Sequence, residues 1–293
     1  RRHLQITGEA IADGMDIRGF YHWSLMDNFE WAEGYDQRFG LYHVDFETKQ
    51  RTLKESGALY SKIVKKHRMP QVVILAGGLG TRLGELTEQM PKSLIEVSGK
   101  PILSHILDWA GQQGCMEALI LTGHLGEQFN GFRHEGMALT FYQEPEPLGT
   151  GGALWNARHL LQDKFILLWG DDFHPIDYAA IVAHHELTSS PLTLTVTTEH
   201  SEMNLLHIDG RISQYDKSGT PPSEFNGYES GTSVVEKSVL LEHGKEGKWS
   251  WEETVYPRMS MKANAYIDNT KFWDMGTPER LERLEEFLNK TSL

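Results

Sequence analysis

The stretch that decides the fold runs from residue 71 to residue 83 and reads QVVILAGGLGTRL. Its first six residues form an apolar run typical of a strand, and Gly77, Gly78 and Gly80 follow within four positions. Glycines after a strand let the backbone approach a phosphate closely, with amide N–H groups aimed at the anion. Arg82 adds a fixed cation. We therefore predict a phosphate-binding loop at the end of a buried strand.

Two familiar phosphate loops do not match this stretch. A Walker loop ends in Gly-Lys followed by Ser or Thr, and this loop has no such ending. A dinucleotide fingerprint expects a third glycine, but Arg82 and Leu83 occupy the places before it. Strand-like and helical segments alternate from residue 71 to residue 275, which predicts an α/β fold with a doubly wound, mostly parallel sheet. The ligand of such a sheet lies at the carboxyl ends of its strands.

The composition changes near Met69 and predicts two domains, residues 1–68 and residues 69–293. The first 69 residues hold 11 basic and 10 acidic side chains, whereas the rest of the chain holds 17 and 31. Ten of the 30 aromatic residues also lie in those first 69 positions. The two parts therefore differ in both charge and aromatic content.

The overall composition excludes several classes of protein. The net charge of -13 disfavours a nucleic-acid binder, which needs a basic surface. No run of 18 apolar residues is present, so we expect no membrane span, and the first residues do not resemble a signal peptide. The single cysteine, Cys115, excludes an internal disulfide framework and fits a reducing compartment, so we expect a cytoplasmic protein.

The aromatic part resembles the last strand, loop and helix of a family 1 glycoside hydrolase, a (β/α)8 barrel. The resemblance rests on residues 23–35, which read WSLMDNFEWAEGY, and on residues 38–41, 44–48 and 51–52. It implies that Trp23, Glu30 and Trp31 derive from a subsite for the sugar glycone. We expect a strand at 18–26 and a helix at about 53–66.

This fragment lacks the residues for glycoside hydrolysis. A retaining glycosidase needs two carboxylates, which the resembled family takes from Asn-Glu-Pro and Glu-Asn-Gly motifs, and neither tripeptide occurs in the chain. We interpret the segment as an inactive barrel piece fused to an enzyme. Its unpartnered aromatic residues are expected to pack on the second domain or on a second copy of the chain, which would give a homo-oligomer.

The second domain resembles the sugar-1-phosphate nucleotidyltransferases, a Rossmann-like family. Residues 75–83 and Pro91-Lys92 carry the signature. Further landmarks follow in the expected order at residues 143–153, 165–172, 216–217, 250–257 and 273–277. The resemblance extends from Pro70 almost to the last residue.

The resemblance implies a role for each matching residue. Arg82 and Lys92 would be catalytic, and Asp171 and Asp274 would bind Mg²⁺, which prefers one or two carboxylates together with phosphate oxygens. The nucleotide-binding residues would be Leu75, Ala76, Gly77, Gly78, Gly80, Thr81, Gln143, Gly149 and Thr150. The residues for the sugar phosphate would be Lys217, Glu252 and Gly231.

The implied reaction joins an NTP and a sugar 1-phosphate to give an NDP-sugar and pyrophosphate. Such a transfer needs positioning and charge neutralisation more than covalent chemistry. Two alternatives stay open: a β-glucosidase, suggested by the first segment alone, and a catalytically idle sugar- or nucleotide-binding fusion. The motifs most resemble guanylyltransferases that act on mannose- or heptose-type 1-phosphates, although Glu229-Ser230 stands where Asn-Ala is usual.

Overall fold

The computed structural model describes residues 2–15, 17, 19–78, 80–217 and 222–291. The chain forms two compact units, residues 1–68 and residues 69–293. Within the described residues, no helix is both long enough and apolar enough to cross a membrane. Each unit is described by itself below.

The first unit is a helix, a loop, a small hairpin and a second helix. Its elements are α1 (Arg2–Ala12), the 3-10 helix η1 (Trp31–Glu33), β1 (Tyr42–Val44), β2 (Arg51–Leu53) and α2 (Glu55–His67). The buried carboxylate of Asp27 organises the loop: it accepts hydrogen bonds from the backbone N–H groups of Gly40 (3.0 Å) and Val44 (3.3 Å), and from Lys54 Nζ (2.7 Å). Burial alone would raise the pKa of Asp27, but these three bonds outweigh it and lower the pKa.

The prediction of a strand at residues 18–26 is wrong. Met26 makes an isolated bridge to Tyr42, and the described residues before it form no strand. Trp23 and Leu25 are 65% and 61% exposed. A strand requires a neighbour along its length, and the described strands of the first unit form one short antiparallel hairpin, β1 with β2. The helix expected at about 53–66 is present as α2.

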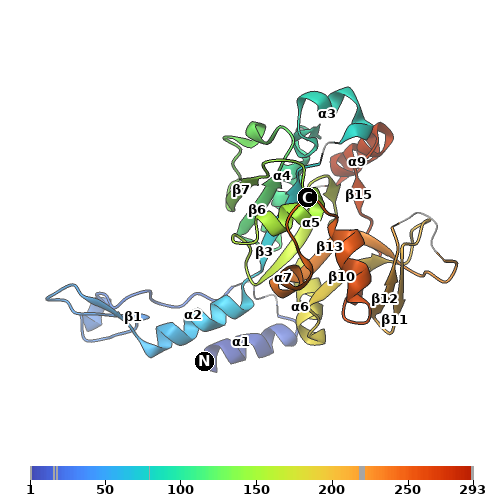
Figure 1. Ribbon diagram of the computed structural model, residues 1–293. Coiled ribbons are helices and arrows are strands. Elements are labelled where there is room, and N and C mark those ends of the chain that lie inside the picture. Colours follow the sequence, from blue (N-terminus) through green and yellow to red (C-terminus); the bar gives the residue numbers. More distant parts are fainter. Residues whose placement is uncertain (1, 16, 18, 79, 218–221, 292–293) are drawn as a thin grey trace. The chain divides into compact units, whose positions relative to one another are not determined.

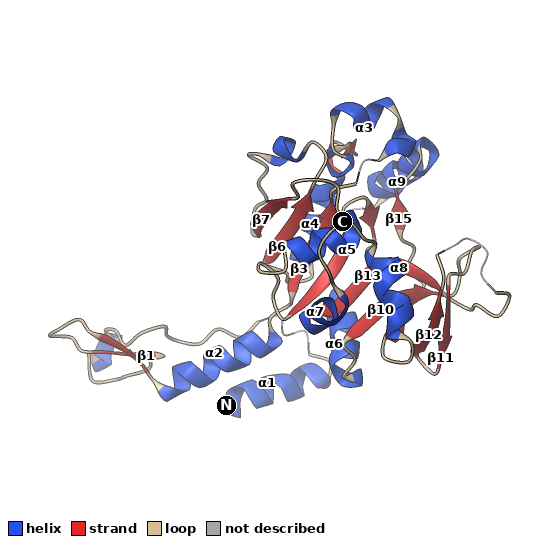
Figure 2. Cartoon of the chain, viewed as in Figure 1, coloured by secondary structure: helices blue, strands red, loops and turns tan. Residues whose placement is uncertain are grey.

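The second unit is built on a nine-stranded sheet. Its strands lie side by side in Figures 1 and 2. One inner strand, β3 (Gln71–Ala76), is buried at all six positions. Strands β7, β6, β3 and β8 are parallel neighbours in that order, and β13 then pairs antiparallel with both β8 and β10. In spatial order the strands are β11 (Leu205–Ile208), β12 (Arg211–Tyr215), β14 (Asn264–Ile267), β10 (Leu192–Thr197), β13 (Tyr228–Glu236), β8 (Lys164–Trp169), β3 (Gln71–Ala76), β6 (Glu117–Thr122) and β7 (Ala138–Gln143).

Helices cover both faces of this sheet. Because side chains alternate along a strand, Val72 and Ile74 pack into one core layer while Val73 and Leu75 pack into the other. The first layer includes side chains of α4 (Ile102–Gln112), α6 (Tyr178–Thr188) and α9 (Pro278–Lys290). The second includes side chains of α5 (Gly149–Asn156), α7 (Lys237–His243) and α8 (Trp251–Val255). This two-sided core confirms the predicted doubly wound α/β fold.

Short elements lie between the main ones. A two-stranded antiparallel sheet of β9 (Asp172–Phe173) and β15 (Trp273–Asp274) joins segments about a hundred residues apart and positions two acidic residues of the site. The others are a second hairpin, β4 (Glu96–Val97) with β5 (Lys100–Pro101), the helix α3 (Glu85–Gln89), and the 3-10 helices η2 (Thr81–Leu83), η3 (Lys92–Leu94), η4 (Gly126–Phe129) and η5 (Tyr256–Met259).

Candidate active site

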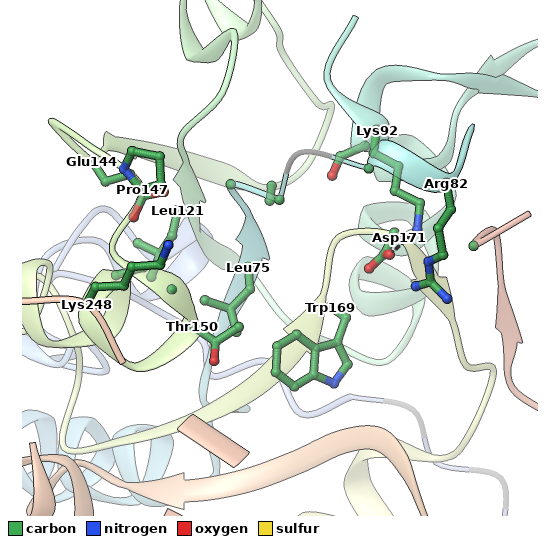
Figure 3. A pocket seen from close by; sticks show the side chains of 18 residues that line it. Leu75, Arg82, Lys92, Leu121, Glu144, Pro147, Thr150, Trp169, Asp171 and Lys248 are labelled. Carbon is green, nitrogen blue, oxygen red and sulfur yellow. Dashed lines mark hydrogen bonds and ion pairs between the residues drawn. The ribbon is translucent and has the colours of Figure 1, made fainter. Parts of the chain in front are cut away.

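A cavity of about 430 Å³ opens at the carboxyl ends of β3, β6 and β8 (Figure 3). This is the position expected for the ligand of a doubly wound sheet. Ten of the predicted site residues line it: Leu75, Ala76, Gly77, Gly78, Gly80, Arg82, Lys92, Gly149, Thr150 and Asp171. The wall is completed by Ser93, Leu121, Glu144, Pro147, Ala153, Trp169, Lys248 and Gly276.

Two glycines allow the walls of this cavity to approach one another. A Cβ on Gly77 would lie 3.0 Å from Glu144 Oε1, so the loop after β3 passes directly over that carboxyl group. Gly149 begins α5 with φ +71°, and a Cβ there would lie 2.7 Å from the carbonyl oxygen of Trp249. A side chain at either position would push the neighbouring segment away.

One end of the cavity holds two basic side chains and one carboxylate. Lys92 Nζ forms an ion pair with Asp171 Oδ2, and Arg82 lies beside them (Figure 3). Lys92 is held by η3 and Asp171 follows β8, so the fold brings together residues 79 positions apart. Two cations beside one carboxylate form a suitable site for a polyphosphate with a divalent metal.

Asp274 lies next to this end. The β9–β15 sheet pairs Asp274 with Asp172, the residue after Asp171. Burial raises the pKa of Asp172 well above its usual range, and the neighbouring carboxylates of Asp171 and Asp274 raise it further. Both oxygens of Asp274 accept hydrogen bonds from Arg280 Nη1, each at 2.9 Å. The two predicted metal ligands therefore flank one buried carboxyl group, and each is paired with a basic side chain.

Two of the three predicted sugar-phosphate residues, Lys217 and Glu252, are in contact, and Gly231 lies against another side chain. Lys217 pairs with Glu252 Oε1, and Thr150 Oγ1 donates to Glu252 Oε2 at 2.8 Å, which ties Glu252 to the cavity wall. Gly231 has φ +86°, and a Cβ there would meet the ring of Trp169 at 2.9 Å. Burial, followed by the charge of Glu252, raises the pKa of nearby Glu229 to about 7.

Two predicted nucleotide-binding residues are not among those that line the cavity: Gln143 lies elsewhere, and the side chain of Thr81 is not described. Gln143, which ends β7, packs against Gly126 and is not among the described residues that line the cavity; its neighbour Glu144 is. Burial raises the pKa of Glu144, whose Oε2 accepts a hydrogen bond from the backbone N–H of Leu148 at 3.1 Å. Thr81 begins η2, but its side chain lies outside the described residues.

A second cavity, of about 370 Å³, has Asp274 and Arg280 in its wall. The rings of His200, Tyr228 and Phe272 form a stack in the same wall, with His200 and Tyr228 centred 3.9 Å apart. The sequence pattern gave no signal for this cavity, because its residues come from four separate segments. They are Thr197, Glu199, His200, Glu202, Tyr228, Asn269, Thr270, Lys271, Phe272, Trp273, Asp274, Arg280 and Arg283.

In the first unit, two of the three predicted glycone residues are in contact. Trp23 Nε1 donates to both carboxylate oxygens of Glu30, at 3.1 and 3.3 Å. Trp31, which begins η1, is 82% exposed.

Two family models match the chain. Residues 1–69 match glycosyl hydrolase family 1, and residues 71–204 match the nucleotidyl transferase family. A β-glucosidase from Agrobacterium sp. is 59% identical over 61 residues, which is 21% of this chain and only 13% of that relative. The chain thus spans a small part of the β-glucosidases that it matches.

The second unit matches its relatives over almost their full length. A D-glycero-alpha-D-manno-heptose 1-phosphate guanylyltransferase from Aneurinibacillus thermoaerophilus is 26% identical over 227 residues, 74% of this chain and 98% of the relative. The crystal structure of HddC from Yersinia pseudotuberculosis, complexed with GMP-PN, aligns with a TM-score of 0.64 at 26% identity, over 75% of this chain and 99% of that one. The second unit is therefore related to the sugar-1-phosphate nucleotidyltransferases, with residues 71–204 matching the nucleotidyl transferase family, and a segment that matches glycosyl hydrolase family 1 precedes it.

Proposed function

We propose that the second unit transfers a guanylyl group from GTP to a heptose- or mannose-type sugar 1-phosphate, with Mg²⁺, and releases pyrophosphate. The observation that carries this proposal is the convergence of Arg82, Lys92 and Asp171 on one cavity, with Asp274 beside it. The choice of guanine and of the sugar class is supported by the heptose 1-phosphate guanylyltransferases among the relatives.

The residues present fit a divalent cation. No group of three or more His, Cys, Asp or Glu suited to a metal occurs among the described residues, but Mg²⁺ in nucleotide sites takes only one or two carboxylates and completes its shell with phosphate oxygens and water. Asp171 and Asp274 supply two carboxylates, and each has a positively charged partner. When bound there, Mg²⁺ would neutralise charge on the triphosphate and orient it.

The chain's own residues would perform the rest of the mechanism. Arg82 and Lys92 hold the triphosphate and balance the charge that develops on the leaving pyrophosphate. Lys217 orients the sugar phosphate, whose oxygen forms a bond to the α-phosphorus as the bond from that phosphorus to the β-phosphate oxygen breaks. This attacking oxygen is already ionised at neutral pH, so the step requires no general base. We therefore assign no catalytic histidine.

The opposite end of the cavity suits a purine base. Glu144, Pro147, Leu121 and Lys248 lie on the side away from Arg82 (Figure 3). An ionised carboxylate only accepts hydrogen bonds, and guanine offers it adjacent N–H donors on one edge. A lysine only donates, and guanine offers O6 and N7 as acceptors. Glu144 and Lys248 together therefore favour guanine over adenine.

The proposed site of the sugar 1-phosphate lies beside Lys217 and Glu252, because Glu252 accepts a hydrogen bond from Thr150 in the wall of the nucleotide cavity. A lysine donates to phosphate oxygens and a carboxylate accepts from sugar hydroxyls, so this pair suits both parts of that substrate.

The test is pyrophosphate release by the full chain with each NTP paired with mannose, heptose and glucose 1-phosphates. We expect turnover with GTP and a heptose or mannose 1-phosphate, and loss of turnover with EDTA that excess Mg²⁺ restores. Binding of GTP without turnover of any pair would instead indicate the catalytically idle fusion.

A further inference from the structure

The hydroxyl group of Thr150 is held from two sides. Its Oγ1 accepts a hydrogen bond from the backbone N–H of Trp251 and donates one to Glu252 Oε2, each at 2.8 Å. Because a backbone N–H only donates and an ionised carboxylate only accepts, the direction of both bonds is fixed. Thr150 lines the first cavity, where the nucleotide is proposed to bind, but its one proton is committed to Glu252. The donor of this side chain therefore serves a residue proposed for the sugar phosphate.

The backbone around Thr150 gives this hydroxyl group a fixed position. Thr150 lies in the first turn of α5, and the next residue, Gly151, donates its backbone N–H to the carbonyl oxygen of Trp249 at 3.0 Å. Trp249 and Trp251 are both buried. Separation of the two segments would expose these large apolar rings to water, which is costly. The start of α5 and the start of α8 are therefore joined firmly at Thr150.

Lys217 depends on this arrangement for its direction. Its side chain is 50% exposed, whereas that of Glu252 is 9% exposed. A lysine half in solvent has many rotamers, so its anionic partner decides where the ammonium group lies. Glu252 Oε1 pairs with Lys217, and Oε2 accepts from Thr150 at 2.8 Å and from Ser250 at 3.3 Å. Because an ammonium group has three donors, Lys217 can keep this pair and still bind a phosphate.

We propose that Thr150 is a positioning residue for the sugar 1-phosphate: its hydroxyl group holds Glu252, and Glu252 holds the ammonium group of Lys217 toward the phosphate. This role rests on the proposed function. A residue in the wall of the nucleotide cavity would then set the affinity for the other substrate.

The first arm of the test measures binding by calorimetry, with each substrate added alone so that no transfer occurs. With Mg²⁺ present, Thr150→Val should weaken binding of mannose 1-phosphate or heptose 1-phosphate to the full chain about tenfold, because one hydrogen bond to a charged group is lost. Binding of GTP should stay within twofold of wild type. Thr150→Ser retains the hydroxyl group and should keep the affinity for the sugar 1-phosphate within twofold of wild type.

The matched control is Thr188→Val. The Thr188 hydroxyl group donates to the carbonyl oxygen of His184 within α6 at 2.8 Å, and Thr188 is not among the described residues that line either cavity. This variant should change neither affinity. If Thr150→Val weakens binding of GTP and of the sugar 1-phosphate equally, or leaves the affinity for the sugar 1-phosphate unchanged, the positioning role is overturned.

The second arm asks whether Thr150 acts through Glu252. In a Glu252→Ala background, Thr150→Val should change the affinity for the sugar 1-phosphate by less than twofold, because the group that Thr150 positions is absent. A tenfold loss in that background overturns the role. If Thr150→Val does not melt cooperatively, Thr150→Ala, which leaves room for water at the Trp251 N–H, replaces it in both arms.

These results can be separated from a failure of the proposed function. Wild type that binds a sugar 1-phosphate but releases no pyrophosphate contradicts the proposed function, and the affinities of the variants still judge the role of Thr150. Wild type that binds neither mannose 1-phosphate nor heptose 1-phosphate overturns that role.

Discussion

The two units differ in what covers their apolar side chains. In the second unit, every position of β3 is buried between two helical layers. In the first, Tyr21, Trp23 and Trp31 are 95%, 65% and 82% exposed, although their sequence is the better preserved of the two matches. Sequence identity to a relative therefore indicates ancestry, whereas a complete set of neighbours determines whether a segment can form a core and a site.

The largest effect is expected from removal of a metal carboxylate in the second unit. Asp171→Asn and Asp274→Asn should each lower kcat by about a thousandfold, because a neutral amide weakens the metal site that balances phosphate charge. Pyrophosphate release at saturating Mg²⁺ measures this. Glu30→Gln in the first unit is the matched control and should leave the rate unchanged. A variant at Asp171 or Asp274 that keeps more than about a tenth of the activity, a barrier change below about 1.4 kcal/mol, would remove that residue from the metal site.

Arg82→Ala should lower kcat by about 10²- to 10³-fold, the usual cost of losing one preorganised electrostatic group. The loss should appear in kcat, and not only in KM, if Arg82 stabilises the negative charge that develops during transfer. Steady-state kinetics with GTP varied at saturating sugar 1-phosphate measure it. A change confined to KM for GTP would limit Arg82 to ground-state binding.

A buried carboxyl group of the second unit should give a pH-dependent stability. Burial raises the pKa of Glu229 from 4.5 to about 7, so the folded state holds this proton more tightly than the unfolded chain does. Stability therefore falls as the pH rises from about 4.5 to 7, and the full penalty of up to about 3 kcal/mol remains above pH 7. Glu229→Gln should raise Tm by several degrees at pH 8 and have little effect at pH 4.5.

This prediction has a clear contrary result. If wild type and Glu229→Gln differ in Tm by the same amount at pH 4.5 and at pH 8, folding does not raise the pKa of Glu229.

Asp27 in the first unit should show the opposite sign and a smaller effect. Its pKa is lowered, so its contribution to stability is present at neutral pH and is lost as the pH falls through the lowered value. Asp27→Asn should destabilise the loop of the first unit by about 2 kcal/mol at pH 7, because it weakens the bonds from Lys54 and from two backbone N–H groups. Limited proteolysis should then cut the first unit faster and leave the second unchanged. If wild type and Asp27→Asn are cut by the protease at the same rate, Asp27 does not organise the loop.

Much of the fold followed from local pattern. The apolar run at 71–76 and the glycines after it predicted a buried strand and the loop that follows it, because both depend on neighbours in sequence. The alternation of strands and helices predicted a doubly wound sheet, and the structure confirms it. The strand expected at 18–26 failed because a strand depends on partners, which a sequence window does not contain.

Site residues that lie together in a contiguous motif could be predicted from the sequence. Site residues that only the fold brings together could not. Ten predicted residues line one cavity. The sequence analysis predicted Gln143 as a nucleotide-binding residue, but the structure has its neighbour Glu144 in the cavity wall. Which of the two side chains faces the cavity depends on where β7 ends. The second cavity had no signal, because it combines residues from 197 to 283. Arg280 lies six positions from Asp274, yet only the turn between β15 and α9 brings the two side chains together.

One measurement tests the contrast between the units most directly: pyrophosphate release from GTP and a sugar 1-phosphate by a chain that begins at Met69, beside the full chain. Residues 69–293 contain both core layers and both cavities, so the shortened protein should melt cooperatively and retain kcat within twofold of the full chain. Residues 1–68 alone should show no cooperative melting, since so small a fragment buries too little apolar surface. A shortened protein that is insoluble or inactive while the full chain turns over would contradict this account and make the first unit part of the enzyme.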